Sequence, residues 1–130
     1  MRISNRNSSG FTLIEVMVAI VIMMVGLLGL LQSINVAMEF NLKNHMRDEA
    51  VYVGERYLNE LKGKGFGNIS ASYSTLTVKS RIRGEKGSLT VDRSSTDMGS
   101  STKRLQVLVK WKYKGVEYEN RVVAPISTSQ

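Results

Sequence analysis

The stretch GFTLIEVMVAIVIMMVGLLGLL occupies residues 10–31 and decides the fold of this chain. Glu15 places one charge near its start, and no other charge follows until Glu39. The uncharged residues Val16–Met38 number 23, and a helix needs roughly 20 apolar residues to cross a bilayer. We therefore expect a membrane-spanning helix. Its Glu15 carboxylate needs compensation, because a charge inside a span costs roughly 2.5–3.5 kcal/mol.

The residues before this helix differ from an ordinary secretory signal. Such a signal has an apolar core of about 7–15 residues followed by a small-residue cleavage motif. Here the apolar run is longer, and a short polar leader with Arg2 and Arg6 ends at Gly10, before the run begins. The Gly-Phe-Thr-Leu-Ile-Glu junction resembles the class III signal of type IV prepilins and type II secretion pseudopilins. The resemblance implies that a prepilin peptidase cuts between Gly10 and Phe11 and methylates Phe11.

The same resemblance implies that Glu15, together with Thr12, acts in assembly. In that family the buried glutamate faces the free amine of a neighbouring subunit, here that of Phe11, so that two buried charges neutralise each other. The alternative is a simple helix-terminal carboxylate, since an acid in the first turn gains about 0.3–1 kcal/mol from the helix dipole. That alternative leaves the coincidence with Gly10 and Phe11 without an explanation.

The helix is expected to continue from Phe11 to Lys62, past the apolar segment. Apolar residues recur on one side at spacings of three or four, as in an amphipathic helix: Leu42, Met46, Ala50, Val53, Tyr57, Leu58 and Leu61. Lys62 and Gly63 supply a basic last turn and a C-cap glycine. We expect four parts: a leader peptide (1–10), a transmembrane and assembly helix (11–38), an amphipathic periplasmic helix (39–62) and a β-sheet head (63–130).

Beyond Gly67 the pattern changes to a period of two. Alternation over residues 76–83 predicts a strand, residues 84–87 a turn, and Leu89 with Val91 a short second strand. The polar residues 94–102 predict a loop.

The clearest strand signal is LQVLVKWKY at residues 105–113, followed by Lys114-Gly115 and a last strand over residues 116–123. A two-residue hairpin loop pairs Tyr113 with Val116, Lys112 with Glu117, Trp111 with Tyr118, Lys110 with Glu119, and Val107 with Val122. This register separates apolar pairs from opposite-charge pairs, and Asn120, opposite Val109, is the discordant residue. We expect the head core to include Trp111, Tyr118, Val107 and Val122, with Trp111 against the helix.

These elements predict an α+β fold. A long N-terminal helix, transmembrane in its first half and amphipathic in its second, packs against a small C-terminal antiparallel β-sheet, as in type IV pilins. The chain contains no cysteine, so packing and strand pairing alone hold the head. The E-x-x-L-x-E-L pattern of residues 55–61 and the tryptophan-bearing strand before the closing hairpin resemble PilV-type minor pilins and minor pseudopilins of type II secretion.

The composition argues against an enzyme. With no cysteine and His45 as the single histidine, neither a Cys/His nucleophile nor a two-histidine metal site can form within one chain, and we expect no cofactor and no metal. The net charge of +7 permits contact with anionic partners. The basic cluster of Lys79, Arg81, Arg83 and Lys86 is typical of a solvated strand face, and nucleic-acid binding is the less favoured interpretation.

The expected function is therefore that of a minor type IV pilin. The chain would sit in the bacterial inner membrane with its head in the periplasm, and would be assembled into a pilus through helix–helix packing with other pilin subunits. The nearest alternative is a minor pseudopilin of a type II secretion system. Two further alternatives are a single-pass protein whose head binds a periplasmic partner and a DNA-uptake pilin. The expected partners are prepilin peptidase, other pilin subunits and inner-membrane lipid.

Overall fold

The computed structural model describes residues 10–82 and 87–128. Residues 1–9 of the predicted leader lie outside the described residues, as do Arg83, Lys86 and most of the predicted turn 84–87. The chain divides after Phe40 into two compact units, and each unit is described by itself below.

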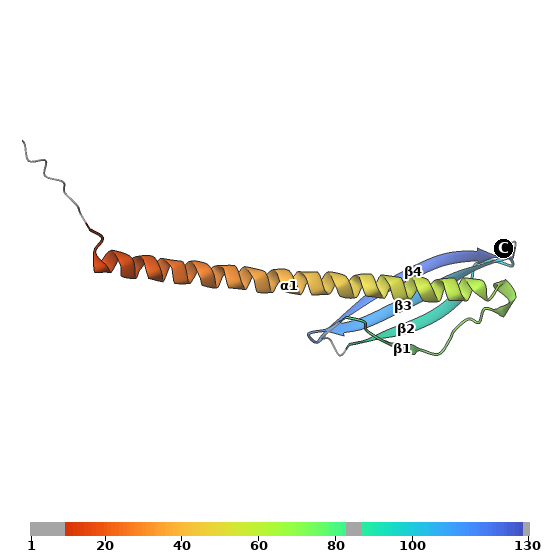
Figure 1. Cartoon of the computed structure of the whole chain (residues 1–130). Coiled ribbons are helices and arrows are strands. Elements are labelled where there is room, and N and C mark those ends of the chain that lie inside the picture. Colours follow the sequence, from red (N-terminus) through yellow and green to blue (C-terminus); the bar gives the residue numbers. More distant parts are fainter. Residues whose placement is uncertain (1–9, 83–86, 129–130) are drawn as a thin grey trace, which may run out of the picture. The chain divides into compact units, whose positions relative to one another are not determined.

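The first unit contains the start of helix α1 (Leu13–Gly63), which appears in Figure 1 as a continuous coil. The helix begins at Leu13 rather than at Phe11, because Thr12 acts as its N-cap. Within the described residues, α1 is the helix that is long and apolar enough to cross a membrane. All side chains from Gly10 to Phe40 are exposed. An apolar surface of this extent is unfavourable in water and favourable in lipid or against other helices.

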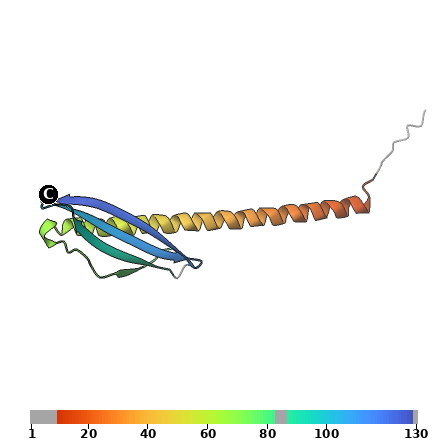
Figure 2. The same cartoon turned by 180° about the vertical axis from the view of Figure 1, so that it is seen from behind.

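The second unit combines the C-terminal part of α1 with a four-stranded antiparallel sheet. The strands follow the chain in the order β1-β2-β3-β4, as a meander, and the helix lies along one face of the sheet (Figures 1 and 2). The strands are β1 (Leu76–Lys79), β2 (Ser88–Asp97), β3 (Thr102–Tyr113) and β4 (Val116–Ser127), and a short 3₁₀ helix, η1 (Phe66–Asn68), follows α1. The predicted α+β fold is confirmed.

The core lies between α1 and this face of the sheet. Alternate residues of β2 and β3 are buried, as expected for strands with one covered face. The helix contributes Met46, Ala50, Val53, Leu58 and Leu61, and the rest of the chain contributes Ile69, Leu89, Val91, Leu105, Val107, Val109, Trp111, Tyr113 and Ile126. Leu42 and Tyr57, the other two members of the predicted helical stripe, are partly buried against this core.

The predicted β3–β4 hairpin is confirmed in all five proposed pairs and in the pairing of Asn120 with Val109. Lys114 and Gly115 have φ angles of 49° and 81°, the positive values that a type I′ turn requires at both central positions. The last strand is longer than predicted. It runs past Val123 to Ser127, because β3 also begins earlier and offers pairing partners as far as Thr102.

The predicted end of the first strand is wrong. β1 ends at Lys79 rather than at residue 83, because a helix carboxylate binds the residues that follow. Glu49 accepts a hydrogen bond from Ser80 Oγ at 2.6 Å and another from the backbone N–H of Arg81 at 2.5 Å. The Arg81 amide is therefore bonded to the helix side chain instead of to a neighbouring strand.

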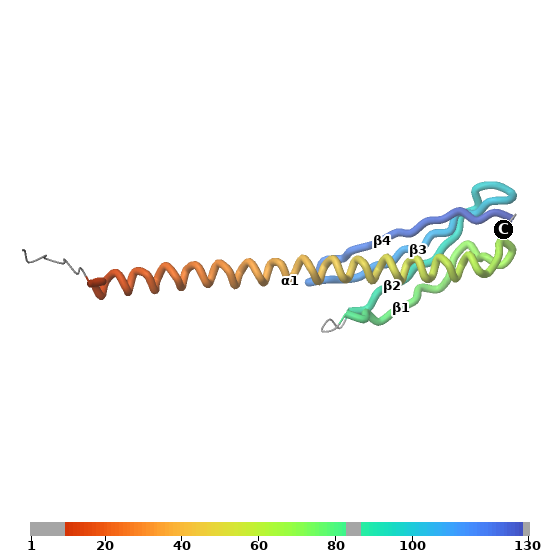
Figure 3. The backbone as a smooth tube through the Cα atoms, turned by 45° about the horizontal axis from the view of Figure 1, so that its top comes forward, coloured from red at the N-terminus to blue at the C-terminus, as the bar shows by residue number. Residues whose placement is uncertain are grey.

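The predicted loop over residues 94–102 is also wrong in extent. β2 continues through Ser94 to Asp97, paired with β3 as far as Lys103, so the connection shortens to residues 98–101. This connection lies beside the C-terminal end of β4 (Figure 3), where the backbone N–H of Thr128 donates to the carbonyl oxygen of Ser101 at 3.0 Å. Pairing with the long strand β3 outweighs the polar composition of this segment.

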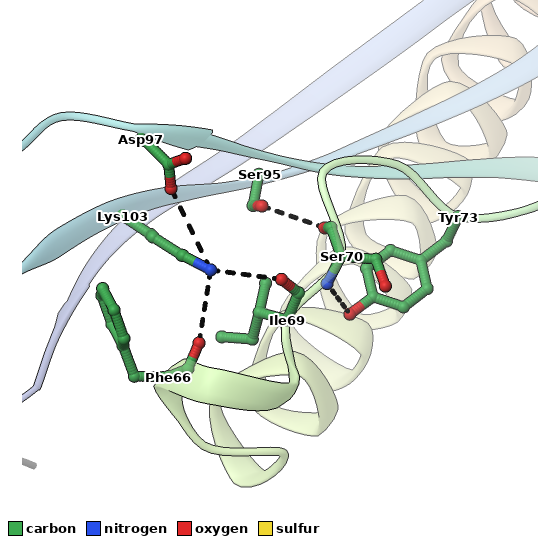
Figure 4. A network of polar contacts seen from close by, with 7 residues as sticks. All are labelled: Phe66, Ile69, Ser70, Tyr73, Ser95, Asp97 and Lys103. Carbon is green, nitrogen blue, oxygen red and sulfur yellow. Dashed lines mark hydrogen bonds and ion pairs between the residues drawn. The ribbon is translucent and has the colours of Figure 1, made fainter. Parts of the chain in front are cut away.

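The segment between α1 and β1 is attached to the sheet by polar contacts (Figure 4) as well as by apolar packing. Lys103 Nζ donates to the carbonyl oxygens of Phe66 at 3.4 Å and Ile69 at 3.3 Å. Ser95 Oγ donates to the carbonyl oxygen of Ser70 at 2.9 Å. These bonds satisfy backbone acceptors that have no regular strand or helix partner, and they hold Ile69 in the core.

Candidate functional site at the N-terminal motif

Thr12 and Glu15 form a reciprocal capping box at the start of α1. The backbone N–H of Thr12 donates to Glu15 Oε2 at 2.8 Å, and the backbone N–H of Glu15 donates to Thr12 Oγ1 at 3.3 Å. A threonine followed three residues later by a glutamate is the sequence signature of this arrangement. Two N–H groups that the helix itself cannot satisfy are thus bonded, and the Glu15 carboxylate has a partner within its own chain.

The peptide bond between Gly10 and Phe11 lies just outside this helix start. Phe11 is 90 % exposed, and no helical hydrogen bonds enclose the bond. An added Cβ at Gly10 would meet nothing within 4 Å, so the described residues around this position leave room for a side chain.

The Glu15 side chain lies among apolar neighbours along α1. Shallow depressions on both sides of it are lined by Ile14, Val18, Ala19 and Ile22, and by Phe11, Val16, Ile20 and Met23. Apart from the capping box, the neighbours of the Glu15 carboxylate are apolar side chains.

The head residues that the sequence proposed lie together at the helix-facing side of the sheet. Trp111 is 7 % exposed and Val107 is fully buried, whereas Tyr118 and Val122 are partly buried and pack against the core. The Trp111 and Tyr118 rings stack with centroids 5.9 Å apart and planes inclined by 19°. His45 is exposed, and within residues 10–82 and 87–128 no group of three acidic, histidine or cysteine side chains could hold a metal ion.

Arg93, a charged residue on the covered side of β2, was not predicted from the sequence. Its guanidinium lies over the rings of Tyr57 and Tyr73, at 5.7 and 5.1 Å from their centroids. Nη2 donates to the carbonyl oxygen of Ser74 at 3.3 Å, and Nη1 lies 3.9 Å from Glu60 Oε1. The register of β2 could have revealed this residue, because strand alternation places residue 93 on the same face as residues 89 and 91. Arg93 thus connects helix, sheet and the segment that joins them.

Residues 5–31 match the family model of the prokaryotic N-terminal methylation motif. No curated protein and no solved structure matched the chain. The motif implies processing by prepilin peptidase. Its position at the start of a long apolar helix is consistent with a location of the protein in the inner membrane. Pilin-family proteins with this motif are structural subunits and not enzymes. The chain is therefore a type IV pilin-like or pseudopilin-like protein, which carries the N-terminal methylation motif of the prepilin family on a pilin-like α+β fold.

Proposed function

We propose that this protein is a minor type IV pilin of the PilV type, assembled into a pilus or at its base. The observation that carries the proposal is the matched methylation motif at residues 5–31. The motif leads into one continuous helix whose C-terminal part supports a folded sheet. A simple membrane anchor has no need of a cleavable junction of this kind, whereas a filament subunit needs both the junction and the long helix.

In this proposal cleavage between Gly10 and Phe11 creates an amine at the start of the helix, and Phe11 is then methylated. The Glu15 carboxylate bonds to the Thr12 N–H of its own chain while the subunit is a monomer in lipid. During assembly the carboxylate pairs with the Phe11 amine of a neighbouring subunit. A charge that is costly in lipid thereby favours ordered packing, with Thr12 keeping the helix start formed.

The four predicted parts of the chain have separate roles in this proposal. The leader is residues 1–10, the helix 11–38 anchors the monomer in the inner membrane and packs among other pilin subunits, and residues 39–62 carry the periplasmic head 63–130. The head holds the core with Trp111, Tyr118, Val107 and Val122. We expect this head to act in the initiation, adhesion or movement of a pilus.

Fractionation of the native host tests this proposal. Cells with and without prepilin peptidase are sheared to separate surface filaments from the envelope, and the chain is detected with an antibody. A pilin should appear in the sheared fraction only when the peptidase is present. A processed chain confined to the envelope would favour the pseudopilin alternative. Unprocessed chain in both strains would favour a membrane-anchored binding module.

A DNA-uptake pilin is the remaining alternative, because Lys79, the last residue of β1, and Arg81 are exposed. Arg83 and Lys86, the other members of the predicted basic cluster, lie outside the described residues. Transformation assays of a deletion strain address this alternative separately from filament assembly.

A further inference from the structure

A groove at the N-terminal end of the second unit combines basic, aromatic and amide side chains. Its volume is about 330 Å³, and its lining comes from the helix and from the β3–β4 hairpin: Lys43, Asn44, Arg47, Trp111, Tyr118, Glu119 and Asn120. Lys43 Nζ lies 5.4 Å from the centroid of the Tyr118 ring, which itself stacks on Trp111. The aromatic pair therefore forms an amphipathic wall, with a cation above it.

Asn120 is the residue that the packing of the head does not explain. It stands on the partly buried side of β4 together with Tyr118, Val122 and Ala124, where an apolar side chain would pack better. It lines the groove, and Asn44 lines it from the helix. Two carboxamides in a groove can donate to phosphate oxygens and can also bond to hydroxyl groups.

The charges of the groove favour an anion. Lys43 and Arg47 stand four residues apart on one face of α1, and the planar guanidinium of arginine matches the geometry of a phosphate. Glu119 is the one carboxylate among the described lining residues, and its cross-strand partner is Lys110. Two cations thus line the groove against a single carboxylate.

The sequence places these cations next to the membrane segment. Lys43 and Arg47 follow Met38, the last residue of the uncharged stretch, by five and nine positions. Residues this close in sequence to a membrane span are within reach of the headgroup layer, which is about 5–7 Å thick on each side of a bilayer. Basic side chains extend back toward such a layer, and tryptophan and tyrosine favour it.

We propose that this groove binds the headgroup of an anionic phospholipid, with Arg47 and Lys43 on the phosphate and Asn44 and Asn120 on a polyol such as glycerol. The site would hold the monomer upright at the periplasmic leaflet before assembly. This inference rests on the proposed insertion of the apolar segment into the membrane. Recovery of the chain outside the membrane fraction of its own cells would overturn that insertion, independently of any lipid preference.

Trp111 is the only tryptophan of the chain, so its fluorescence reports on the groove directly. The full-length protein in detergent micelles is titrated with dioctanoyl phosphatidylglycerol, with dioctanoyl phosphatidylcholine, or with glycerol phosphate. We expect a saturable change in Trp111 emission with phosphatidylglycerol only. The double variant Lys43→Gln/Arg47→Gln should bind about 30-fold more weakly, since each basic residue near an anionic lipid surface contributes about fivefold.

The matched control is Arg56→Gln/Lys62→Gln, which removes the same charge from exposed positions farther along α1. Arg56 lies about 13 Å of helical rise beyond Arg47, more than the screening length of about 8–10 Å at moderate salt, so the control should change the affinity by less than about twofold.

Equal losses in both double variants would show a net-charge effect and overturn the site. Equal responses to both lipids would overturn it as well. Glycerol phosphate binding as tightly as phosphatidylglycerol would assign the groove to a soluble phosphate ester instead. An acidic segment of a second copy would be the occupant if the Lys43/Arg47 variant kept its lipid affinity and lost filament incorporation.

Discussion

Gly54 of α1 lies directly against Val122 of β4. An added Cβ at Gly54 would come within 2.9 Å of Val122 Cγ2, so the absence of a side chain at position 54 sets how closely the helix approaches the sheet. Valine is stiff about χ1 and cannot turn away cheaply. Gly54→Ala gains about 1 kcal/mol of helix propensity but overpacks the core by roughly 1–3 kcal/mol. We expect a net loss of about 1 kcal/mol in the free energy of unfolding, measured by urea denaturation of the fragment 33–130.

The partner variant Val122→Ala isolates this contact. In the Val122→Ala background, a new methyl group at position 54 has two remaining neighbours. They are the Cβ of residue 122 at 3.9 Å and Val109 Cγ2 at 3.5 Å, which are ordinary van der Waals distances. Gly54→Ala should therefore become neutral or stabilising there. Gly67→Ala, where nothing lies within 4 Å, serves as the control. The packing argument fails if Gly54→Ala destabilises equally with and without Val122.

Arg93→Ala should destabilise the head by about 2 kcal/mol, because it removes the apolar stem together with two aromatic contacts. The pair with Glu60 contributes little, since that carboxylate side chain is 50 % exposed. Arg93 Nε is buried without a hydrogen-bond partner, so Arg93→Met should cost less than about 1 kcal/mol. Thermal unfolding of both variants checks this, with exposed Arg121→Ala as the matched control. Equal losses for Ala and Met would show that the charge itself stabilises this position.

Trp111→Ala should cost about 3–5 kcal/mol, the range for a large buried aromatic. Trp111 is 7 % exposed and stacks on Tyr118, so its emission should be blue-shifted and poorly quenched by acrylamide in the fragment 33–130. Deletion through Leu61 should instead leave an aggregating or disordered chain, because a small sheet is marginal without its helix. Red-shifted, freely quenched Trp111 in the longer fragment would contradict the docking of the sheet on α1.

Glu15→Gln and Glu15→Leu separate the capping function of this residue from its charge. Glutamine keeps an oxygen that can accept from the Thr12 N–H, whereas leucine removes both the acceptor and the charge. We expect both variants to insert in the membrane with folded heads and to be poorly incorporated into filaments. Immunoblots of sheared filaments and of membranes measure the two steps. Normal incorporation of the glutamine variant alone would show that Glu15 acts as a helix cap only.

The hairpin of β3 and β4 could be predicted because its information is local. A two-residue loop at Lys114-Gly115 fixes the register, and each cross-strand pair then agrees in polarity. The ends of β1 and β2 could not be predicted in this way. They depend on Glu49, 31 residues before Ser80 in sequence, and on the length of β3 as a partner for Ser94–Asp97.

The N-terminal motif could be recognised in the sequence for a related reason. Thr12 and Glu15 interact across three positions, and the motif around Gly10 is continuous. Gly54 could not be identified as important, and for Arg93 the register of β2 was the one sequence signal, since both roles arise from contacts made by distant segments. An arginine in an alternating polar strand is normally predicted to be exposed, and a glycine within a helix is normally predicted to weaken the helix. Only the packing of helix on sheet shows why each is present.

The mass of the mature chain shows whether this protein is processed as a prepilin. The protein is purified from its native membrane in cells that contain or lack prepilin peptidase, and its intact mass is measured. We expect residues 11–130 with one added methyl group on Phe11 in the first case and the full chain in the second. Gly10→Ala should give the full chain in both. Recovery of only the full chain from peptidase-containing cells, or a cut at any other bond, would contradict this expectation.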